Sequence, residues 1–446
     1  MGLFDDFGES PTGCLLRVSR IRIERRKMKP KVVIIGCGAR GGETYGRYFV
    51  QSGDAEIVAI CDNNAERLES YKREFGLTDE QCFIDYNVLF ALGKIADVCV
   101  VAVMDRDHHD VAMKAMKLGY HLLLEKPVCG TAQECIEIRD YAESHNLLVT
   151  VCHVMRYTPY YRYLKKLLAD GEIGEIMGIE QTEDVAYWHM AHAFVRGNFC
   201  NSNTTSPMIL QKCCHDMDLL VYLTEQRPKA VSSMGSLRYF KSQNAREGSA
   251  ERCVDCKVKG CPFNAVDFYY GNVKELIGTG RPTKVWPYAQ VAVDPTPENI
   301  MESLRTTHWG KCVFHSDNNV VDHQFSVIQF ANGLVGTLTM IGFSAEGGRQ
   351  THVYGTKGEV FLNEQTRTIT LQRFGEEKHI TNFDSLATDF SGHGGGDKVM
   401  LREFFENIEL GKKTLNTDIV RSIDSHLMCF AAEESRISGG KVVDIK

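Results

Sequence analysis

The segment 31–41 constrains the fold more than any other part of this chain. It reads Lys-Val-Val-Ile-Ile-Gly-Cys-Gly-Ala-Arg-Gly, an apolar, β-branched run that leads into three glycines at the spacing G-x-G-x-x-G, and a helical pattern follows. This order predicts a strand, a tight turn and a helix. Gly36 permits the turn, Gly38 lets the backbone approach a phosphate without a Cβ, and Gly41 lets the helix pack against the strand. The N–H groups at the start of that helix would face a pyrophosphate.

An acid at the end of the next predicted strand indicates which dinucleotide is bound. The strand 56–61 ends at Asp62, which lies 21 residues after Gly41. A carboxylate at an offset of about 20 residues binds the ribose diol of the adenosine. Because it would also repel a 2′-phosphate, Asp62 favours NAD over NADP. The alternative is a βαβ unit in which the glycines serve only the turn and the acid has no ligand.

Length and composition narrow the class of protein. The chain has 446 residues, enough for two domains, and its 43% apolar and 24% charged residues are typical of soluble globular proteins. The net charge of −7 argues against a nucleic-acid partner and against an anionic membrane surface. No apolar run approaches the ~18–20 residues that span a bilayer. We therefore expect neither nucleic acid nor membrane as a partner.

The first residues and the cysteine content bear on location. Residues 1–28 contain many Arg and Lys but no apolar core of roughly 7–15 residues, so they predict a disordered extension rather than a secretory signal. Sixteen cysteines without such a signal indicate free thiols in a reducing compartment. These features predict a cytoplasmic protein.

The hydrophobic pattern divides the chain into two domains. Over 29–155, predicted strands alternate with predicted helices, which indicates an NAD-binding α/β domain with a doubly wound parallel sheet. Over 156–446, strand-like segments follow one another without regular helices between them, which indicates an α+β domain with a large, mainly antiparallel open sheet. The predicted strands are 31–35, 56–61, 97–103, 120–124, 147–151, 174–184, 229–239, 323–331, 334–343, 350–354 and 367–373. The predicted helices lie near 41–51, 64–75, 107–118, 130–145 and 159–170, with two more over 397–437.

A cysteine-containing insertion over about 241–318 interrupts the second domain. Two of its cysteines are separated by two residues and a third follows after four more, a spacing typical of metal ligands. A metal would stabilise a long irregular stretch that lacks a core. Structural zinc is favoured over an iron–sulfur cluster, because hydride chemistry needs no electron-transfer centre. The alternative is three free thiols without a metal. The expected ligands are Cys253, Cys256 and Cys261, with Cys312 or His315 as the fourth.

A lysine stands at the end of the fifth predicted strand, in the sequence Leu124-Glu125-Lys126-Pro127. Ligands of open parallel sheets lie outside the carboxyl ends of the strands, so Lys126 would face the nicotinamide end of a bound dinucleotide. Its ammonium group can there hydrogen-bond a substrate hydroxyl and help to remove its proton. The alternative is a solvated lysine in a turn.

Together these motifs resemble the Gfo/Idh/MocA oxidoreductases. The resemblance covers about residues 31–446 and rests on the glycine turn, Asp62, the Asp107-His-His109 region with its helix ending Lys117-Leu-Gly-Tyr-His, and Glu125-Lys126-Pro127. It implies an N-terminal Rossmann domain, a C-terminal α/β domain with a large open sheet, a nicotinamide cofactor and a sugar-like or cyclitol substrate. It also implies a homodimer or homotetramer that forms through the large sheet. The expected cofactor-binding residues are Gly36, Gly38, Ala39, Arg40, Gly41, Asp62, Asp105, His109 and Glu125.

The family usually carries a second active-site motif, in which an Asp precedes a His by four residues and another Asp follows that His by three. This chain reads Gln211-Lys-Cys-Cys-His215-Asp-Met-Asp218, so Gln211 replaces the first acid. Gln211 and His215 share one helical face, but an amide cannot accept a proton. We therefore assign proton abstraction to His215, with Lys126 as its electrostatic partner. The alternative for His215 is a core or interface histidine.

Three further segments contain groups that suit sugar rings. One follows a strand and is dense in aromatic and imidazole side chains, one follows the last strand of the first domain, and one is a glycine-rich loop that can close over a ligand. For each segment the alternative is packing or turn formation. The expected substrate contacts are Arg156, Tyr157, Tyr187, His189, His192, Gln211 and His393.

Three functions follow from these residues. The first is NAD-dependent oxidation of a secondary hydroxyl of a sugar, glycoside or cyclitol. The second is a redox-neutral glycosidase or lyase that cleaves a glycosidic bond through a transient keto intermediate, which the replacement at Gln211 and the insertion favour. The third is a non-catalytic NAD-binding regulatory protein. Lys126 and His215 argue against the third, since a sensor needs neither.

Overall fold

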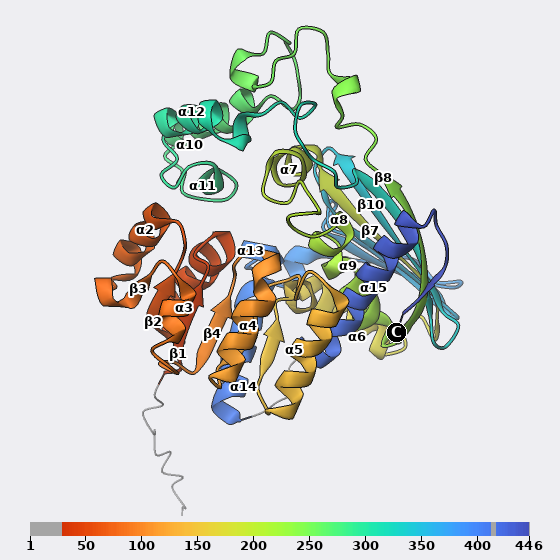
Figure 1. Ribbon diagram of the computed structural model, residues 1–446. Coiled ribbons are helices and arrows are strands. Elements are labelled where there is room, and N and C mark those ends of the chain that lie inside the picture. Colours follow the sequence, from red (N-terminus) through yellow and green to blue (C-terminus); the bar gives the residue numbers. More distant parts are fainter. Residues whose placement is uncertain (1–28, 412–415, 446) are drawn as a thin grey trace, which may run out of the picture.

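A computed structural model describes residues 29–411 and 416–445 (Figure 1). The expected disordered extension at 1–28 lies outside these residues. The chain forms a six-stranded sheet followed by a nine-stranded sheet. In the part of the chain that is described, no helix is long and apolar enough to cross a membrane.

The first sheet has the strand order β3-β2-β1-β4-β5-β6 and every neighbouring pair is parallel. This order reverses direction between β1 and β4, and a crevice at such a point is where dinucleotides bind. The predicted doubly wound sheet is confirmed, although the two-residue strand β3 was missed. The strands are β1 (Lys31–Ile35), β2 (Glu56–Cys61), β3 (Cys82–Phe83), β4 (Val98–Val101), β5 (His121–Leu124) and β6 (Val149–Val151).

Helices cover both faces of this sheet because its strands are apolar on both faces. In β1, Val32 and Ile34 pack into one hydrophobic cluster while Val33 and Ile35 pack into another. The helices of this part are η1 (Ala39–Gly46), α1 (Arg47–Ser52), α2 (Ala65–Phe75), η2 (Asp79–Gln81), α3 (Tyr86–Phe90), η3 (Asp105–Asp107), α4 (His108–Lys117) and α5 (Ala132–Ser144).

The second sheet has the order β14-β13-β12-β11-β7-β10-β9-β8-β15. Only β7 and β10 pair in parallel, so the predicted mainly antiparallel sheet is confirmed. Three more strands, β12, β14 and β15, were missed. The two-residue strand β15 and the polar strand β14 are the edge strands of the sheet, and β12 is separated from β11 by only two residues. The strands are β7 (Ile176–Ala186), β8 (Pro228–Ser236), β9 (His323–Phe330), β10 (Val335–Ser344), β11 (Gly348–Gly355), β12 (Gly358–Asn363), β13 (Thr368–Arg373), β14 (His379–Asn382) and β15 (Val443–Asp444).

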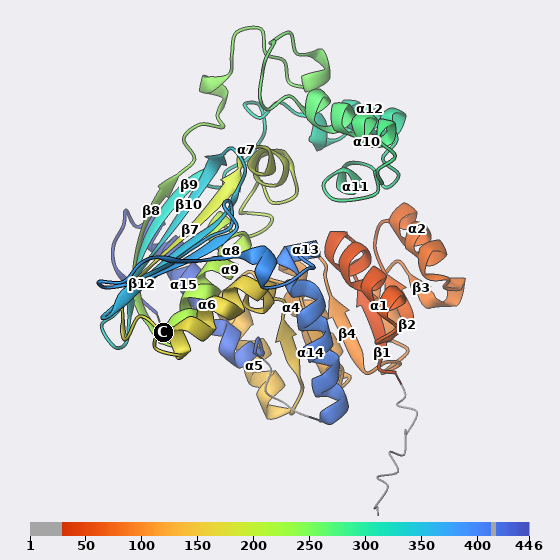
Figure 2. The same ribbon diagram turned by 180° about the vertical axis from the view of Figure 1, so that it is seen from behind.

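Helices α6, α9 and α15 pack on one face of this sheet, and α15 also packs against α5 of the first part (Figure 2). Helix α15 and the residues before it therefore join the two halves, and Val151 of β6 donates a backbone hydrogen bond to Thr417. The helices are η4 (Val154–Tyr157), α6 (Pro159–Ala169), α7 (Tyr187–His189), η5 (Met190–Arg196), α8 (Met208–Gln211), α9 (Cys214–Thr224), η10 (Phe383–Ser385), α13 (Ser391–Gly394), α14 (Gly396–Leu410) and α15 (Ile419–Ile437).

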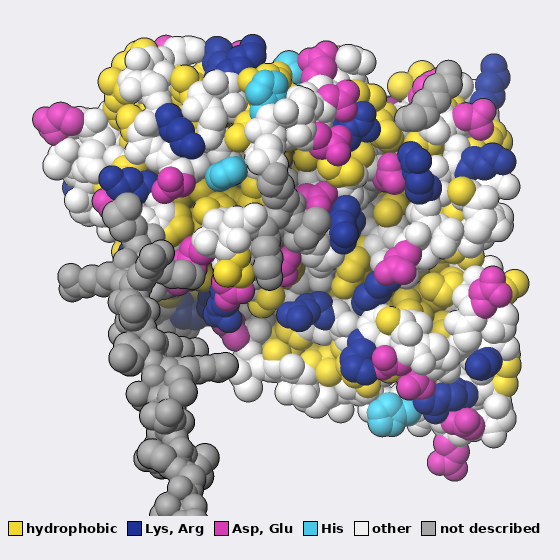
Figure 3. Space-filling view, turned by 90° about the horizontal axis from the view of Figure 1, so that it is seen from below, with side chains coloured by type: hydrophobic (Ala, Val, Ile, Leu, Met, Phe, Trp, Pro, Cys, Tyr) yellow, Lys and Arg dark blue, Asp and Glu magenta, His cyan; other side chains and the backbone are white. Residues whose placement is uncertain are grey.

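The other face of the large sheet carries exposed apolar side chains. Phe325 of β9 is 49% exposed and lies beside Met234 of β8, which is 63% exposed, and Val327 is exposed two residues further on. Such a face is typical of an interface, and the homodimer or homotetramer remains a prediction. Figure 3 shows the molecule from below, where acidic and basic side chains are interspersed among apolar ones.

The insertion at 241–318 is more regular than expected. It contains three α-helices and four short 3-10 or π segments, and residues such as Tyr269, Ile300 and Leu304 form a small buried core of its own. The expectation of a stretch without a core is therefore wrong. The helices are η6 (Ser242–Asn244), η7 (Cys253–Asp255), η8 (Val266–Gly271), α10 (Asn272–Gly278), α11 (Tyr288–Val291), α12 (Pro297–Thr306) and η9 (His308–Gly310).

Candidate active site

The glycine turn has the shape that a dinucleotide requires. Gly36 has φ +92°, and a Cβ there would lie 2.3 Å from the Ala102 carbonyl oxygen. A Cβ on Gly41 would lie 1.8 Å from the Gly36 oxygen, so only glycine permits this packing of helix on strand. A Cβ on Gly38 would meet no atom within 4 Å. The backbone is thus open at the one glycine where a phosphate would approach.

Asp62 follows β2 and lies beside this turn. Its Oδ2 accepts a hydrogen bond of 2.8 Å from the Cys37 N–H, and its Oδ1 accepts one of 2.8 Å from the Asn64 N–H. Arg67 at the start of α2 pairs with the same carboxylate at 3.2 Å. These contacts hold the carboxylate at the edge of the glycine turn, where a ribose diol would lie. The turn and this acid together fit a dinucleotide.

Lys126 reaches from the end of β5 to the second half of the chain. Its Nζ donates to the Gln211 backbone oxygen at 2.9 Å and to the Gln211 Oε1 at 3.2 Å. Gln211 in turn donates from Nε2 toward Asp105 at 3.5 Å. The ammonium group is therefore fixed by the amide that replaces the family's first acid.

Two buried histidines hold the loop around Lys126. His108 contacts the Pro127 carbonyl oxygen through Nδ1 at 2.7 Å. His426 of α15 accepts a hydrogen bond from the Val128 N–H through Nε2 at 2.9 Å. Neither His108 nor His426 was predicted as a site residue. No local pattern marks His426, which lies 298 residues away from Val128 along the chain.

His215 lies on α9 with an unsatisfied ring nitrogen. Its Nδ1 is buried and has no hydrogen-bond partner. The rings of His153 and His393 lie 5.6 and 6.1 Å from its ring, centroid to centroid. Burial, and then the charge of Lys126, lower the pKa of His215 well below its ordinary value. The imidazole is therefore neutral at neutral pH and able to accept a proton.

A network of charged groups closes the site from the glycine turn to α14. Arg40 pairs with Glu125 at 2.5 Å and with Asp397 at 2.6 Å, and Tyr45 donates to the same Glu125 oxygen. The Nδ1 of His393 lies 3.1 Å from Asp397 and 3.3 Å from Arg40. His393 therefore lies beside Arg40 of the glycine turn, and its contact with a substrate remains a prediction. Tyr45 and Asp397 were missed, although Asp397 ends the glycine-rich loop that carries His393.

Four residues expected at the site lie elsewhere or serve another role. Arg156 is buried and forms two hydrogen bonds with Asp218, at 2.6 and 2.7 Å. Tyr157 is buried, and its hydroxyl contacts Glu403 and Thr417. His109 pairs with Glu137 between α4 and α5 at 3.0 Å, whereas its neighbour His108 faces the Lys126 loop. The four corrected residues are Arg156, Tyr157, His109 and His192.

His192 packs inside the insertion rather than toward a substrate. Its nitrogens lie 2.8 Å from the hydroxyl of Tyr269 and 2.8 Å from the Oε1 of Gln290, and its ring stacks on Trp309. His189, three residues earlier, is half-buried. Burial, and then the charges of Lys212, His192 and Lys126, lower the pKa of His189 well below its ordinary value.

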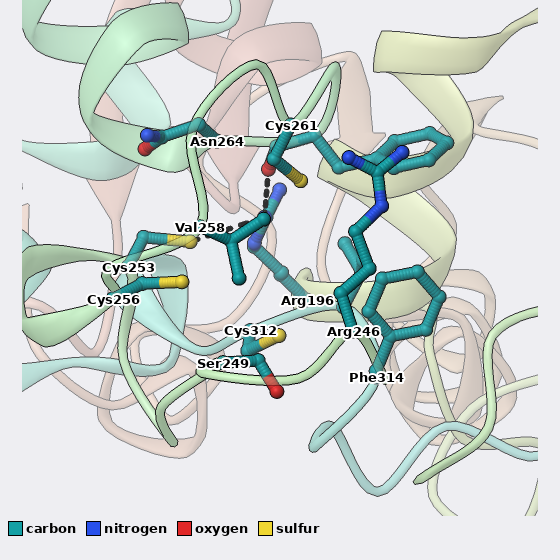
Figure 4. Close-up of a pocket in the computed structure, with 12 residues that line it drawn as sticks. Arg196, Arg246, Ser249, Cys253, Cys256, Val258, Cys261, Asn264, Cys312 and Phe314 are labelled. Atoms are coloured by element: carbon teal, nitrogen blue, oxygen red, sulfur yellow. Dashed lines mark hydrogen bonds between the residues drawn. The ribbon is translucent and has the colours of Figure 1, made fainter. Parts of the chain in front are cut away.

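Four cysteines line one pocket under the insertion (Figure 4): Cys253, Cys256, Cys261 and Cys312. Across residues 29–411 and 416–445, however, no group of three or more His, Cys, Asp or Glu is placed to hold a metal ion. The described structure therefore does not support the predicted zinc site, with either Cys312 or His315 as the fourth ligand. His315 contacts Ser249 instead.

Arg196 provides the cross-link that a metal was expected to provide. Its guanidinium donates to the backbone oxygens of Lys311 and Phe263 and to the Sγ of Cys253, the last at 3.6 Å. These bonds tie three segments of the insertion to η5. The fifteen cysteines of the described residues are all free thiols.

Comparison with known proteins identifies the family. Residues 30–153 match the family described as "Oxidoreductase family, NAD-binding Rossmann fold", and residues 165–443 match "Oxidoreductase family, C-terminal alpha/beta domain". The chain belongs to the Gfo/Idh/MocA oxidoreductase family. It is 26% identical to YteT of Bacillus subtilis (strain 168) over 424 residues, covering 90% of this chain and 94% of YteT.

Other members of the Gfo/Idh/MocA family show what this chain is similar to. It is 26% identical to inositol 2-dehydrogenase of Salmonella typhimurium over 49% of this chain and 60% of that protein. Levoglucosan dehydrogenase in complex with NADH and levoglucosan superimposes with a TM-score of 0.67 at 18% identity, covering 94% of this chain and 100% of that one. Inositol 2-dehydrogenase of Lactobacillus plantarum gives 0.63 at 18%, with coverage of 94% and 100%. These structures support the fold.

Two alanine substitutions distinguish cofactor binding from folding at the glycine turn. Gly38→Ala should fold normally, because the φ of −74° at this position suits alanine and the added Cβ meets no atom within 4 Å. The same Cβ should obstruct the phosphate and weaken dinucleotide binding by roughly tenfold or more. Gly41→Ala should lower the free energy of unfolding by about 1–3 kcal/mol, because its Cβ meets backbone. Thermal unfolding and NAD titration measure both. Equal dinucleotide affinity in Gly38→Ala and the wild type would contradict the assignment.

The buried histidines should make the protein sensitive to acid. Burial lowers the pKa of His426 to about 3 and that of His192 to about 4, so the unfolded chain binds more protons than the folded one below pH 6.5. Each histidine should then cost about 2 kcal/mol of stability when the pH falls to 5. Unfolding temperature should fall between pH 7.5 and pH 5. His426→Gln, which keeps an acceptor for the Val128 N–H, should flatten this dependence, and the exposed His379→Gln serves as the control.

Proposed function

We propose that this protein is an NAD-dependent oxidoreductase that acts on a secondary hydroxyl of a sugar, glycoside or cyclitol. The proposal rests on Lys126 and His215. Gln211 holds the Lys126 ammonium in place through two hydrogen bonds. The Nδ1 of His215 has no hydrogen-bond partner, and burial and the charge of Lys126 lower the pKa of this histidine. Lys126 follows β5 of the first sheet, and His215 lies on α9 of the second half of the chain, four residues after the Gln211 that Lys126 contacts. The sugar and cyclitol names of the relatives support the substrate class.

The chain's own residues would orient the substrate and move its proton. His215 would accept the hydroxyl proton through the unpartnered nitrogen, and Lys126 would stabilise the developing negative charge on the oxygen. The bound dinucleotide supplies the hydride acceptor. Gln211 holds Lys126 and cannot itself take the proton, so proton abstraction depends on His215.

Asp62 supports NAD as the cofactor rather than NADP. Its two oxygens accept hydrogen bonds from the Cys37 N–H of the glycine turn and from the Asn64 N–H after β2, and these bonds hold the carboxylate where it would repel a 2′-phosphate. The residues that would hold the cofactor are Gly36, Gly38, Ala39, Arg40, Gly41, Asp62, Asp105 and Glu125.

Removal of either proposed catalytic group tests the proposal. Lys126→Met and His215→Asn should each lower kcat/KM by about 10²–10⁴-fold, because each removes a group that acts on the proton or the oxyanion. NAD affinity should stay nearly unchanged. Lys229→Met, at an exposed lysine of β8, is the matched control. The assay follows NADH at 340 nm with a panel of sugars, glycosides and cyclitols, and unchanged turnover in either variant removes that residue from the mechanism.

A redox-neutral glycosidase or lyase is the second candidate, and one set of contacts favours it. Lys284 of the insertion donates to Ser70 at 2.6 Å and pairs with Glu74 at 3.3 Å, while the Trp286 N–H donates to Glu43. These bonds fasten the insertion to the helices that flank the glycine turn. A cofactor covered in this way suits a reaction that takes a hydride and returns it within one turnover.

Product analysis separates the two reactions. Cleavage of a glycosidic bond without accumulation of NADH identifies the redox-neutral reaction, and NADH that matches product one for one identifies the dehydrogenase. NAD binding without turnover of any substrate would instead indicate a regulatory protein.

A further inference from the structure

A second cavity lies between α7 and the insertion, next to the proposed active site. It has a volume of about 560 Å³, within the range that holds small ligands. Tyr187 and Trp188 line it from α7, and Phe268 and Tyr288 line it from the insertion. All four side chains are half-buried, so part of each ring faces the cavity rather than the core.

The rings of this cavity form a nearly continuous aromatic surface. Trp188 stacks on Phe268 at 5.4 Å with an angle of 27° between the rings, and Phe268 lies 6.4 Å from Tyr288. Trp286, 5.4 Å from Trp188, extends the same cluster. Aromatic faces attract the apolar C–H faces of ligands and leave hydroxyl groups free at the ring edge.

Polar side chains complete the lining. Asn264 and Asn272 are half-buried and Asp267 is exposed. Amide groups donate and accept hydrogen bonds, and an ionised carboxylate accepts two or more, which is the set that a ring bearing several hydroxyls requires. The Asn264 Oδ1 also accepts a hydrogen bond of 2.9 Å from the Val266 N–H, which orients this amide at the cavity wall.

Trp286 brings the cavity close to the glycine turn. Its ring lies 5.4 Å from that of Trp188, which lines the cavity, and 5.0 Å from that of His189. The Trp286 N–H donates a hydrogen bond to Glu43, which follows the glycine turn. A ligand that lies beside a dinucleotide bound at that turn can therefore extend into the aromatic cavity.

We propose that this cavity is a second sugar subsite, so that the substrate is a glycoside of at least two rings, with the reacting ring beside Lys126 and His215 and the other ring against Trp188. The proposal rests on the proposed function. It also gives the insertion a role, because the insertion supplies the second wall of the cavity.

Binding measurements that need no turnover test the subsite. Saturation-transfer NMR and calorimetry on the full chain loaded with NAD would use cellobiose, maltose and lactose as probes, with glucose and galactose as single-ring controls. We expect at least one disaccharide to bind about tenfold more tightly than its component sugars, with saturation transfer to both rings. Binding of single sugars alone, with no gain from a second ring, would overturn the subsite.

Variants assign the second ring to this cavity. Trp188→Ala should weaken disaccharide binding by about tenfold and leave single-sugar binding unchanged. Asp267→Ala, at an exposed position where folding is unaffected, should act in the same direction. Phe374→Ala, at a 68% exposed aromatic residue away from the cavity, is the matched control. Equal disaccharide affinity in both cavity variants and the control would contradict the proposal.

Turnover separates this proposal from the proposed function. If disaccharides bind through Trp188 but are neither oxidised nor cleaved, the subsite stands and the proposed function fails. If single sugars are oxidised with the same kcat/KM as disaccharides, the function stands and the subsite fails.

Discussion

The arrangement of the site depends on the pair of hydrogen bonds between Lys126 and Gln211. They join the end of a Rossmann strand to the start of the helical segment that carries His215. Since an ammonium group is costly to desolvate without partners, the amide both stabilises the charge and directs it. Burial, and then the charge of Lys126, lower the pKa of His215. The contact with Gln211 therefore sets the position of the charge that acts on His215.

Much of the first sheet could be predicted because its information is local. The apolar run of β1, the glycines and Asp62 lie within a few dozen residues, and each has a steric or electrostatic reason for its place. Lys126 could be placed because parallel strands end at a common edge. The same reasoning could not reach His426 or Asp397, whose partners lie hundreds of residues away in sequence.

Residue type alone was a poor guide to which polar groups face the site. Arg156 and His192 have chemistry that suits a sugar, yet one neutralises the buried Asp218 and the other packs on Trp309. Buried charges require partners, and a large domain with several buried acids uses its arginines for them. Arg349, which pairs with Asp216 and Glu183, shows the same use. The spacing of the cysteines likewise does not reveal that Arg196 lines the same pocket and donates to Cys253.

Helix α15 connects the two halves of the molecule. It packs on β8 of the large sheet and on α5, which covers the first sheet, so the two halves share a helix at this point rather than a hinge. Ligands would then enter and leave the crevice at the insertion, which α15 does not hold and which Lys284 and Trp286 fasten to the first sheet's helices. Opening the crevice at the insertion would break the bonds of Lys284 with Ser70 and Glu74 and that of the Trp286 N–H with Glu43, and it would leave the contacts of α15 with both sheets intact.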